Sequence, residues 1–177
     1  MLYFNKAKHA EASIIFKLIN LAYRGETSRQ GWTTEADILD GLRVTTKEIS
    51  RIIKQDSSVV LPSFIIVGKK NDEIIATICC EKYNTEAHFG MIAVNPIAQN
   101  KGHGKALIKA AEKITFLEWR VKSFALDVIS VRTELIAFYE RLGYKQTGGF
   151  RTFPVNPLVW QPKVDGLKLV RLEKLID

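Results

Sequence analysis

The segment from Asn95 to Ala106 constrains the fold most, because it joins an apolar strand pattern to an amphipathic helix pattern through a short loop with two glycines. Met91–Val94 is an apolar run typical of a buried strand, and Pro96 ends it because proline has no backbone N–H. Apolar residues then recur at three- and four-residue steps, which predicts a helix beginning near Gly104. They are Leu107, Ala110, Ala111, Ile114 and Leu117.

The glycines of this loop fall on the first turn of the predicted helix. There the free N–H groups and the positive end of the helix dipole attract an anion, and residues without side chains let phosphate oxygens approach the backbone. Lys101 and Lys105 add positive charge beside Gly102 and Gly104. The loop therefore indicates a phosphate-binding site.

Three interpretations of the Gly-x-Gly pattern compete with one another. A plain strand-to-helix turn is the commonest use of glycine. The dinucleotide fingerprint needs a third glycine where this chain has Leu107, and a P-loop needs Ser or Thr where it has Ala106. The remaining pattern is Gln-x-x-Gly-x-Gly, beginning at Gln99 and preceded by Val-x-Pro. It resembles the acetyl-CoA-binding motif of the GNAT (GCN5-related) N-acetyltransferase family.

The segment from Leu126 to Tyr144 resembles the second signature of this family: a strand, a helix with a Phe-Tyr pair, then glycine and an aromatic residue. Its apolar residues follow a helical period, and Gly143 stands where a helix would stop. Tyr139 in this helix has two interpretations. A Tyr on an apolar stripe is commonly a core aromatic. The resemblance instead implies a general acid beside the CoA sulfur, since a phenol of pKa about 10 can protonate a departing thiolate.

The resemblance implies acetyl-CoA as co-substrate, held between a splayed strand and the glycine loop. It assigns cofactor contacts to Ile92, Ala93, Val94, Gln99, Asn100, Lys101, Gly102, His103, Gly104, Lys105, Arg132 and Phe138. Arg132 stands where many members carry Asn. It could donate to a CoA phosphate or be a solvated charge at a helix start, and the second is favoured because a cation there opposes the dipole.

The acceptor amine is expected to enter from the other side of the splay, over segments that vary between family members. Here the variable part includes the polar, glycine-punctuated stretch 24–35, which predicts an acceptor wall with Glu26, Trp32 and Glu35 as substrate-binding candidates. The alternative is an ordinary helix connection with Trp32 folded onto the core.

The amine must be neutral to attack a thioester, so a base is required. His88 is the first candidate, because it lies eleven residues before Gln99, where some family members carry a catalytic Glu. An imidazole, with an ordinary pKa of about 6.5, can take the proton at neutral pH. A histidine that only packs is the alternative, and Glu26, Glu35 and Glu86 are weaker candidates. We expect direct transfer in a ternary complex, with strand N–H groups near residues 92–94 stabilising the tetrahedral intermediate.

Length and composition suit one domain spanning residues 1–177, since the chain has 177 residues and 46% hydrophobic content. No apolar run approaches the roughly 18 residues that cross a bilayer, and the N-terminus lacks the apolar stretch of a secretion signal. We therefore expect no membrane association and a cytoplasmic location. Cys79 and Cys80 are adjacent, so neither a disulfide framework nor a metal site is expected.

A net charge of +7 favours anionic partners, which CoA phosphates or nucleic acid would satisfy. Lys and Arg are scattered and no nucleic-acid-binding motif occurs, so a nucleic-acid-binding protein is the less favoured function. A non-catalytic module that senses acetyl-CoA is the second alternative to an acetyltransferase. The acceptor, the length of the acyl group and the oligomeric state stay open, with a homodimer as one option.

Strand and helix patterns alternate along the chain, which predicts an α/β (α+β) fold with a mixed sheet of about seven strands flanked by about four helices. Strands are expected at 2–4, 59–67, 73–83, 88–94, 124–129, 144–146 and 167–172. A first helix is expected to end at Gly25. Capping boxes at Thr34 and Thr45 predict two short helices running to about Gln55, ahead of the glycine-loop helix and the Tyr139 helix.

Overall fold

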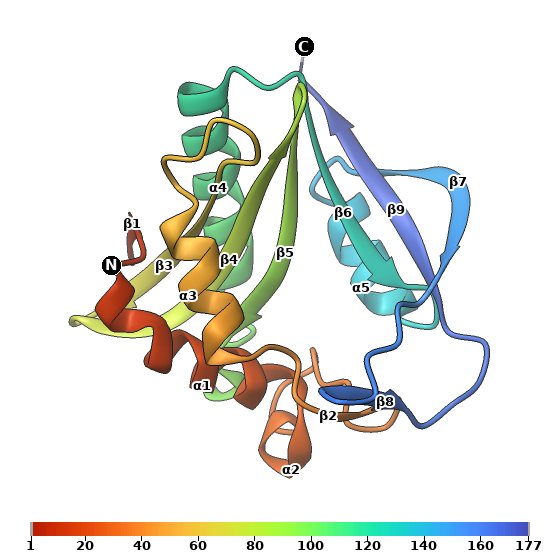
Figure 1. Ribbon diagram of the computed structural model, residues 1–177. Helices are drawn as coiled ribbons and strands as arrows, with labels where there is room; N and C mark the ends of the chain where they lie inside the picture. The colour runs from red at the N-terminus through yellow and green to blue at the C-terminus, as the bar shows by residue number, and fades with distance from the viewer. Residues whose placement is uncertain (1, 177) are drawn as a thin grey trace.

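Residues 2–176, the part of the chain that the computed structural model describes, form a seven-stranded mixed sheet with helices on both faces (Figure 1). Positions 1 and 177 of the expected domain lie outside this range. The strand order is β1-β3-β4-β5-β6-β9-β7, and all neighbours are antiparallel except β5 and β6. The bounds are β1 (Tyr3–Lys6), β3 (Ser63–Lys70), β4 (Glu73–Tyr83), β5 (Glu86–Val94), β6 (Ser123–Ile129), β7 (Lys145–Thr152) and β9 (Lys168–Leu175). The expected mixed α/β fold is confirmed.

Two helices cover each face of the sheet, with α1 and α3 on one face and α4 and α5 on the other (Figure 1). The helices are α1 (Ala12–Tyr23), α2 (Gly25–Ser28), α3 (Thr46–Lys54), α4 (His103–Trp119) and α5 (Thr133–Glu140), with short 3-10 turns η1 (His9–Glu11) and η2 (Pro96–Ala98). None of the helices in the described part of the chain is long and apolar enough to cross a bilayer.

Strand β3 shows why the sheet holds two cores. Ile65 and Val67 pack under α1 and α3, whereas Phe64 and Ile66 belong to the core on the opposite face, where Phe64 packs on Trp119 of α4. Side chains alternate between the faces of a strand, so the apolar run predicted here is the pattern of a strand buried on both sides. Each fully buried side chain of this kind contributes about 1.5–3 kcal/mol.

Strands β3 and β4 form an antiparallel hairpin, and its turn follows from two polar residues. Asn71 and Asp72 have φ values of 50° and 64°. Asn and Asp tolerate this left-handed backbone, and two consecutive positive φ values match the twist of the strands that the turn joins. The hairpin fixes the register of β4, against which β5 then pairs.

Strands β5 and β6 pair over only part of their length and then separate (Figure 1). Pairing runs from Glu86 to Phe89 on β5, opposite Ser123 to Leu126 on β6. Beyond it, β5 carries an irregularity against β4, with Met91 at φ 48°. This separation is the expected splayed strand pair, and within residues 2–176 it leaves one edge of β5 without a strand partner beyond Phe89.

The helix expected from the capping box at Thr34 is absent, and that prediction was wrong. The Thr34 hydroxyl does accept from the backbone N–H of Ala36, at 3.2 Å, but the chain then turns into strand β2 (Leu39–Gly41). A Thr hydroxyl can accept from the N–H two residues later in a turn as well as at the start of a helix, so this bond does not require a helix. At Thr45 the prediction holds, because its hydroxyl accepts from the Glu48 N–H at 3.2 Å and caps α3.

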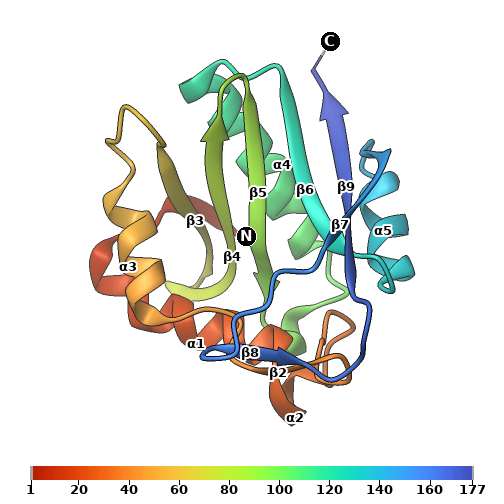
Figure 2. The same ribbon diagram turned by 45° about the vertical axis from the view of Figure 1, so that its right-hand side comes forward.

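Other differences concern segments whose structure depends on distant contacts. Strand β3 starts at Ser63 rather than residue 59, and Val59 and Val60 are 98% and 84% exposed. Strand β8 (Trp160–Pro162) was not predicted, because three residues show no clear alternation. It pairs with β2 to form a second small sheet at the open end of the splay (Figure 2).

Gly41 is required where β2 meets β8, and this requirement gives a stability test. Its φ is +85°, and a Cβ there would lie 2.2 Å from the Val159 carbonyl oxygen. We expect Gly41→Ala to cost about 1–3 kcal/mol and to lower the melting temperature by several degrees. Gly149→Ala is the matched control, because a Cβ at Gly149 meets no atom within 4 Å. Equal melting temperatures for the two variants would contradict the account.

Candidate active site

Two cavities adjoin at the splay of β5 and β6, and both are lined by Tyr23, Ile92, Leu135 and Tyr139. The larger, of about 370 Å³, reaches the glycine loop and is called the loop cavity. The smaller, of about 240 Å³, is called the roof cavity, because Trp160 of β8 and residues 153–154 contribute to its wall. Two differently lined spaces thus meet at these four residues, and the region where they meet is called the passage.

The glycine loop forms the polar end of the loop cavity. Gly102 is the N-cap of α4, with φ 77°, and a Cβ there would meet no atom within 4 Å. Helix α4 is 17 residues long, so a full helix dipole and free N–H groups point from its first turn. The lining residues from this loop are Gln99, Asn100, Gly102, His103, Gly104 and Lys105. Lys101 does not line it, since its Nζ donates to the Ile97 carbonyl at 3.4 Å.

The electrostatics of the loop end favour an anion. Burial together with the charges of Lys70 and Lys101 lowers the pKa of His103. Lys105 and Arg141 line the same cavity. Arg141 was not predicted as a site residue. Its position one helical turn after Phe138, which was predicted, is the sequence feature that could have indicated it. A cluster of cations that depresses a neighbouring imidazole pKa is a site where a phosphate would be stabilised.

Gln99 lies in the wall, but its side chain is occupied by the protein. Its Nε2 donates to the Thr33 hydroxyl at 2.9 Å and to the Val94 carbonyl at 3.1 Å, and its Oε1 accepts from the Trp32 N–H at 2.9 Å. A Cβ at Gly31 would lie 2.6 Å from this side chain, so the loop passes close only because Gly31 has none. Gln99 therefore connects residues 31–33 to the end of β5. The sequence predicted a cofactor contact for Gln99 and did not predict this structural role.

The free edge of β5 presents N–H groups to the cavities. The Asn95 N–H bonds the Ile75 carbonyl of β4, and Ala93 lies opposite Thr77. Backbone groups of successive residues point to opposite edges, so those of Ile92 and Val94 face the splay. Their carbonyls accept from the Tyr23 hydroxyl, at 2.6 Å, and from Gln99. The two N–H groups thus face the passage. Ala93, also expected at the cofactor, is buried in the core and lines neither cavity.

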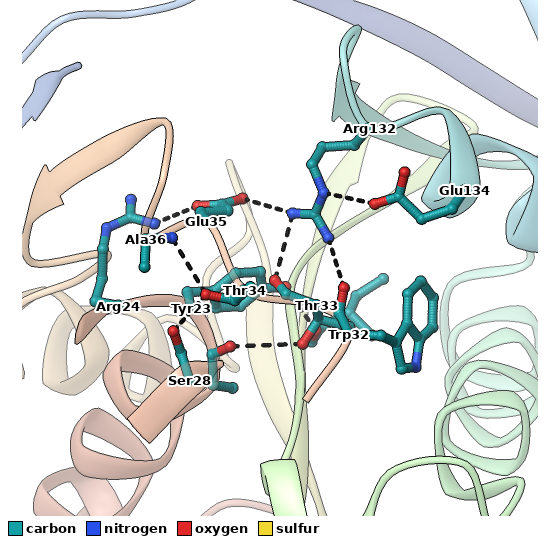
Figure 3. Close-up of polar contacts among 12 residues, drawn as sticks. Tyr23, Arg24, Ser28, Trp32, Thr33, Thr34, Glu35, Ala36, Arg132 and Glu134 are labelled. Carbon is teal, nitrogen blue, oxygen red and sulfur yellow. Dashed lines mark hydrogen bonds and ion pairs between the residues drawn. The ribbon is translucent and has the colours of Figure 1, made fainter. Parts of the chain in front are cut away.

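Arg132 is not the solvated charge that the sequence favoured; its side chain is only 8% exposed. Its Nε donates to Glu134 at 3.0 Å, and its Nη atoms donate to the carbonyls of Trp32 and Thr33, both at 3.3 Å (Figure 3). The prediction failed because the loop carbonyls and two carboxylates compensate the cation at the start of α5.

Glu35 lies between two arginines (Figure 3). It forms an ion pair with Arg24 and lies 3.8 Å from Arg132. All three side chains are buried, and Glu35 and Arg132 line the roof cavity with Arg24. Arg24 and Glu35 are thus the residues of the stretch 24–35 that line the roof cavity, and their charges compensate each other; the expected acceptor wall stays a prediction.

The other candidates on the predicted acceptor wall lie elsewhere. Glu26 is a surface residue, with a side chain 86% exposed and paired to Arg29. Trp32 lines the loop cavity, where it packs edge-to-face on Phe138 at 5.6 Å. Glu86, at the paired end of β5, forms an ion pair with Arg171 and lines neither cavity. The structure therefore does not bring Glu26 or Glu86 to the cavities.

His88 lines the roof cavity and has a carboxylate partner that was not predicted. Its Nε2 lies 3.1 Å from Oδ2 of Asp127, which also forms an ion pair with Arg151. Burial opposes ionisation, but the His88 bond and the charge of Arg151 hold the pKa of Asp127 below its ordinary value. This bond favours the imidazole with its hydrogen on Nε2, which leaves Nδ1 able to accept a proton. The sequence feature that could have indicated this carboxylate partner is an aspartate within the otherwise apolar strand β6.

Two tyrosines stand at the junction of the cavities. Tyr139 is 5% exposed, and burial followed by the influence of Tyr23 raises its pKa well above the ordinary value. Burial also raises the pKa of Tyr23, to about 12. Both hydroxyls are therefore protonated at neutral pH. Within residues 2–176 no group of three potential His, Cys, Asp or Glu metal ligands lies together.

Comparison with known proteins places this geometry in context. The sequence profile described as the acetyltransferase (GNAT) family matches residues 31–144. No curated protein sequence matches significantly.

Similar solved structures share the architecture at low sequence identity. A GNAT family acetyltransferase from Elizabethkingia anophelis with acetyl-CoA bound has a TM-score of 0.68 and 15% identity, covering 99% of this chain and 98% of that one. The spermidine/spermine N-acetyltransferase SpeG from Vibrio cholerae, in complex with manganese ions, gives 0.67 and 16%, covering 98% and 92%. Protein smu.2055 from Streptococcus mutans gives 0.71 and 19%, covering 99% of each chain. These likenesses show the fold.

Proposed function

This chain belongs to the acetyltransferase (GNAT) family, and from that premise we propose that the loop cavity holds acetyl-CoA while the roof cavity holds a primary amine. The observation that carries the proposal is the passage itself: two cavities of different lining share Tyr23, Ile92, Leu135 and Tyr139. Two reactants entering from the two cavities would meet there without a covalent enzyme intermediate, which suits direct transfer in a ternary complex.

The lining of the loop cavity fits acetyl-CoA, which supplies an acetyl thioester. The first turn of α4 with Lys105 and Arg141 would hold the diphosphate. The N–H groups of Ile92 and Val94 would donate to amide or thioester oxygens that approach β5 as an added strand would. Donors fixed in a strand need no reorganisation to stabilise a developing oxyanion, which is the main way that such sites lower a barrier.

His88 would accept the proton of the amine on the roof side. Asp127 would act as its positioning residue, because the bond to Nε2 directs Nδ1 toward the proton-accepting role. Glu35 is the weaker candidate, since two arginines already compensate its charge.

Tyr139 would donate its proton, or a hydrogen bond, to the sulfur that leaves. A raised pKa makes a phenol a weaker acid, but the burial that raises it would also raise the pKa of a thiol formed in the same space. The pKa difference between the phenol and the thiol would therefore be smaller than the shift of the phenol alone suggests, which favours proton transfer.

The acceptor of the Vibrio cholerae enzyme, a polyamine, is not carried over to this chain. Three arginines and two carboxylates line the roof cavity, namely Arg24, Arg43, Arg132, Glu35 and Asp127, which does not favour a polycation. An acetyl-CoA sensor without turnover is the alternative, and it differs from an enzyme in showing binding without acetyl transfer. Cytoplasmic location and homodimer formation stay predictions.

The first test concerns cofactor binding. Acetyl-CoA at a hundred times its dissociation constant should stabilise the fold by about 2.7 kcal/mol, or roughly 5–10 °C in melting temperature. Gly104→Asp should remove the shift by placing a carboxylate beside the diphosphate. Its Cβ would make ordinary contacts, 3.8 Å from Phe138 and 3.9 Å from Val94, and an acidic residue in the first turn suits the dipole of α4.

Gly149→Asp is the matched control for Gly104→Asp, since it makes the same substitution in the edge strand β7, where a Cβ meets no atom within 4 Å. It should keep the full acetyl-CoA shift. Absence of any shift in the wild-type protein would exclude the cofactor assignment.

The second test concerns Tyr139. Tyr139→Phe keeps the ring and removes the proton donor, so we expect turnover to fall by roughly ten- to a thousandfold while acetyl-CoA still binds. Tyr144→Phe is the control, because that hydroxyl is also buried but bonds Glu112 at 2.9 Å, away from both cavities. Steady-state rates, affinities and melting temperatures are measured on each preparation. Full activity of the Tyr139→Phe variant would make Tyr139 a core aromatic, and lost affinity would assign it to binding.

The third test concerns the base. His88→Gln should lower turnover at pH 7 by about a hundredfold or more with acetyl-CoA affinity nearly unchanged, because an amide cannot accept the amine proton. His9→Gln makes the same change at an exposed position in η1 and should leave the rate unaltered. A near-normal rate for His88→Gln would return His88 to a packing role and direct attention to Glu35.

A further inference from the structure

Arg43 is a cation in the wall of the roof cavity that no carboxylate of the described residues neutralises. Within residues 2–176, no ion pair joins its guanidinium to a carboxylate. Its Cζ lies 5.7 Å from the centroid of the Tyr23 ring, a cation–π contact that leaves the N–H donors for another partner. Its backbone N–H is held separately, by Asn20 at 2.7 Å.

The other charges lining this cavity are compensated within the protein. Arg24 and Arg132 share Glu35, and Arg132 also bonds Glu134. Asp127 is paired with His88 and Arg151. Among the described residues, a ligand in the roof cavity would therefore meet one positive charge without an ion-pair partner, and an unpaired, half-buried guanidinium is a strong bidentate site for a carboxylate.

The remaining wall limits the size and character of the ligand. The cavity measures about 240 Å³, and its roof is apolar, with Phe153, Pro154, Trp160 and Leu169. Arg43 also lies over Tyr23, and Tyr23 lines both cavities, so a ligand bound at Arg43 would lie next to the junction. An acid group bound at Arg43 would leave the rest of a compact molecule between the apolar roof and the junction at Ile92 and Tyr139.

We propose that the acceptor is a compact primary amine that also carries a carboxylate, of the amino-acid type, and that Arg43 binds this carboxylate and so orients the amine toward the junction. This inference rests on the proposed function, and it deepens it by naming the acceptor class. Arg43 is a specificity-determining residue in this account, since it touches the substrate but takes no part in proton transfer.

A four-carbon series of probes tests the charge preference directly, with the protein saturated with CoA. γ-Aminobutyrate, butylamine and putrescine differ only in an anionic, neutral or cationic end, and L-phenylalanine with phenethylamine forms a second pair with an apolar group. Affinities are measured by saturation-transfer NMR titration. We expect an acid-bearing probe to bind about tenfold or more tightly than its partner without the acid.

Two substitutions at Arg43 and one elsewhere complete the test. Arg43→Gln should abolish the difference within each pair, and Arg43→Glu should turn the preference toward putrescine. Arg51→Gln removes the same charge from the exposed side of α3, where Arg51 bonds Gln55, and should retain the wild-type preference.

Three outcomes would overturn the inference: equal affinities within each pair of the wild-type protein, a wild-type preference for putrescine, or no binding of any acid-bearing probe. Because these outcomes use the wild-type chain, they do not depend on how the variants fold. Acetylation is followed separately with acetyl-CoA. Acid-selective binding without acetyl transfer would contradict the proposed enzymatic function while leaving the role of Arg43 intact.

Discussion

The loss of pairing between β5 and β6 after Phe89 is the constraint on which the candidate site depends. A strand edge without a partner leaves backbone N–H and carbonyl groups that must be bonded by other groups or by water. In this chain the carbonyls and the N–H groups differ in this respect. The carbonyls of Ile92 and Val94 accept from the side chains of Tyr23 and Gln99, whereas their N–H groups face the passage. At these two residues the edge therefore offers N–H donors to a ligand, while its carbonyl acceptors are already bonded.

The segment of residues 31–35 lies beside the splay and is bonded from two sides. Gln99, directly after η2, bonds it from one side, and Arg132 bonds its carbonyls from the start of α5. Glu35, in the same segment, pairs with Arg24 at the end of α1. The segment therefore ties together three elements that the sheet alone would leave apart. Buried bonds of this kind are costly to break singly, because each loss leaves a polar group without a partner.

Sequence predicted the parts of the site that depend on local pattern, and the rest depends on contacts between distant residues. Met91–Val94 and the glycine loop lie in adjoining positions of the chain, so a strand, a turn and a helix start were readable there. The burial of Arg132 was not, because its partners, Trp32 and Thr33, lie about a hundred residues away. The same holds for β8, which exists only by pairing with β2.

The junction between the cavities also determines where charge can reside during transfer. Tyr23 and Tyr139 are buried and stay protonated, so neither supplies a negative charge to the passage. In such a low-dielectric space the N–H groups of β5 interact more strongly with a developing oxyanion than they would in water. In the proposed mechanism a proton leaving the amine would need a more polar exit, and the candidates for it are His88 and Asp127 in the roof cavity. The amine nitrogen both attacks and loses the proton, so it would have to lie between the thioester at the junction and His88, reached directly or through one water.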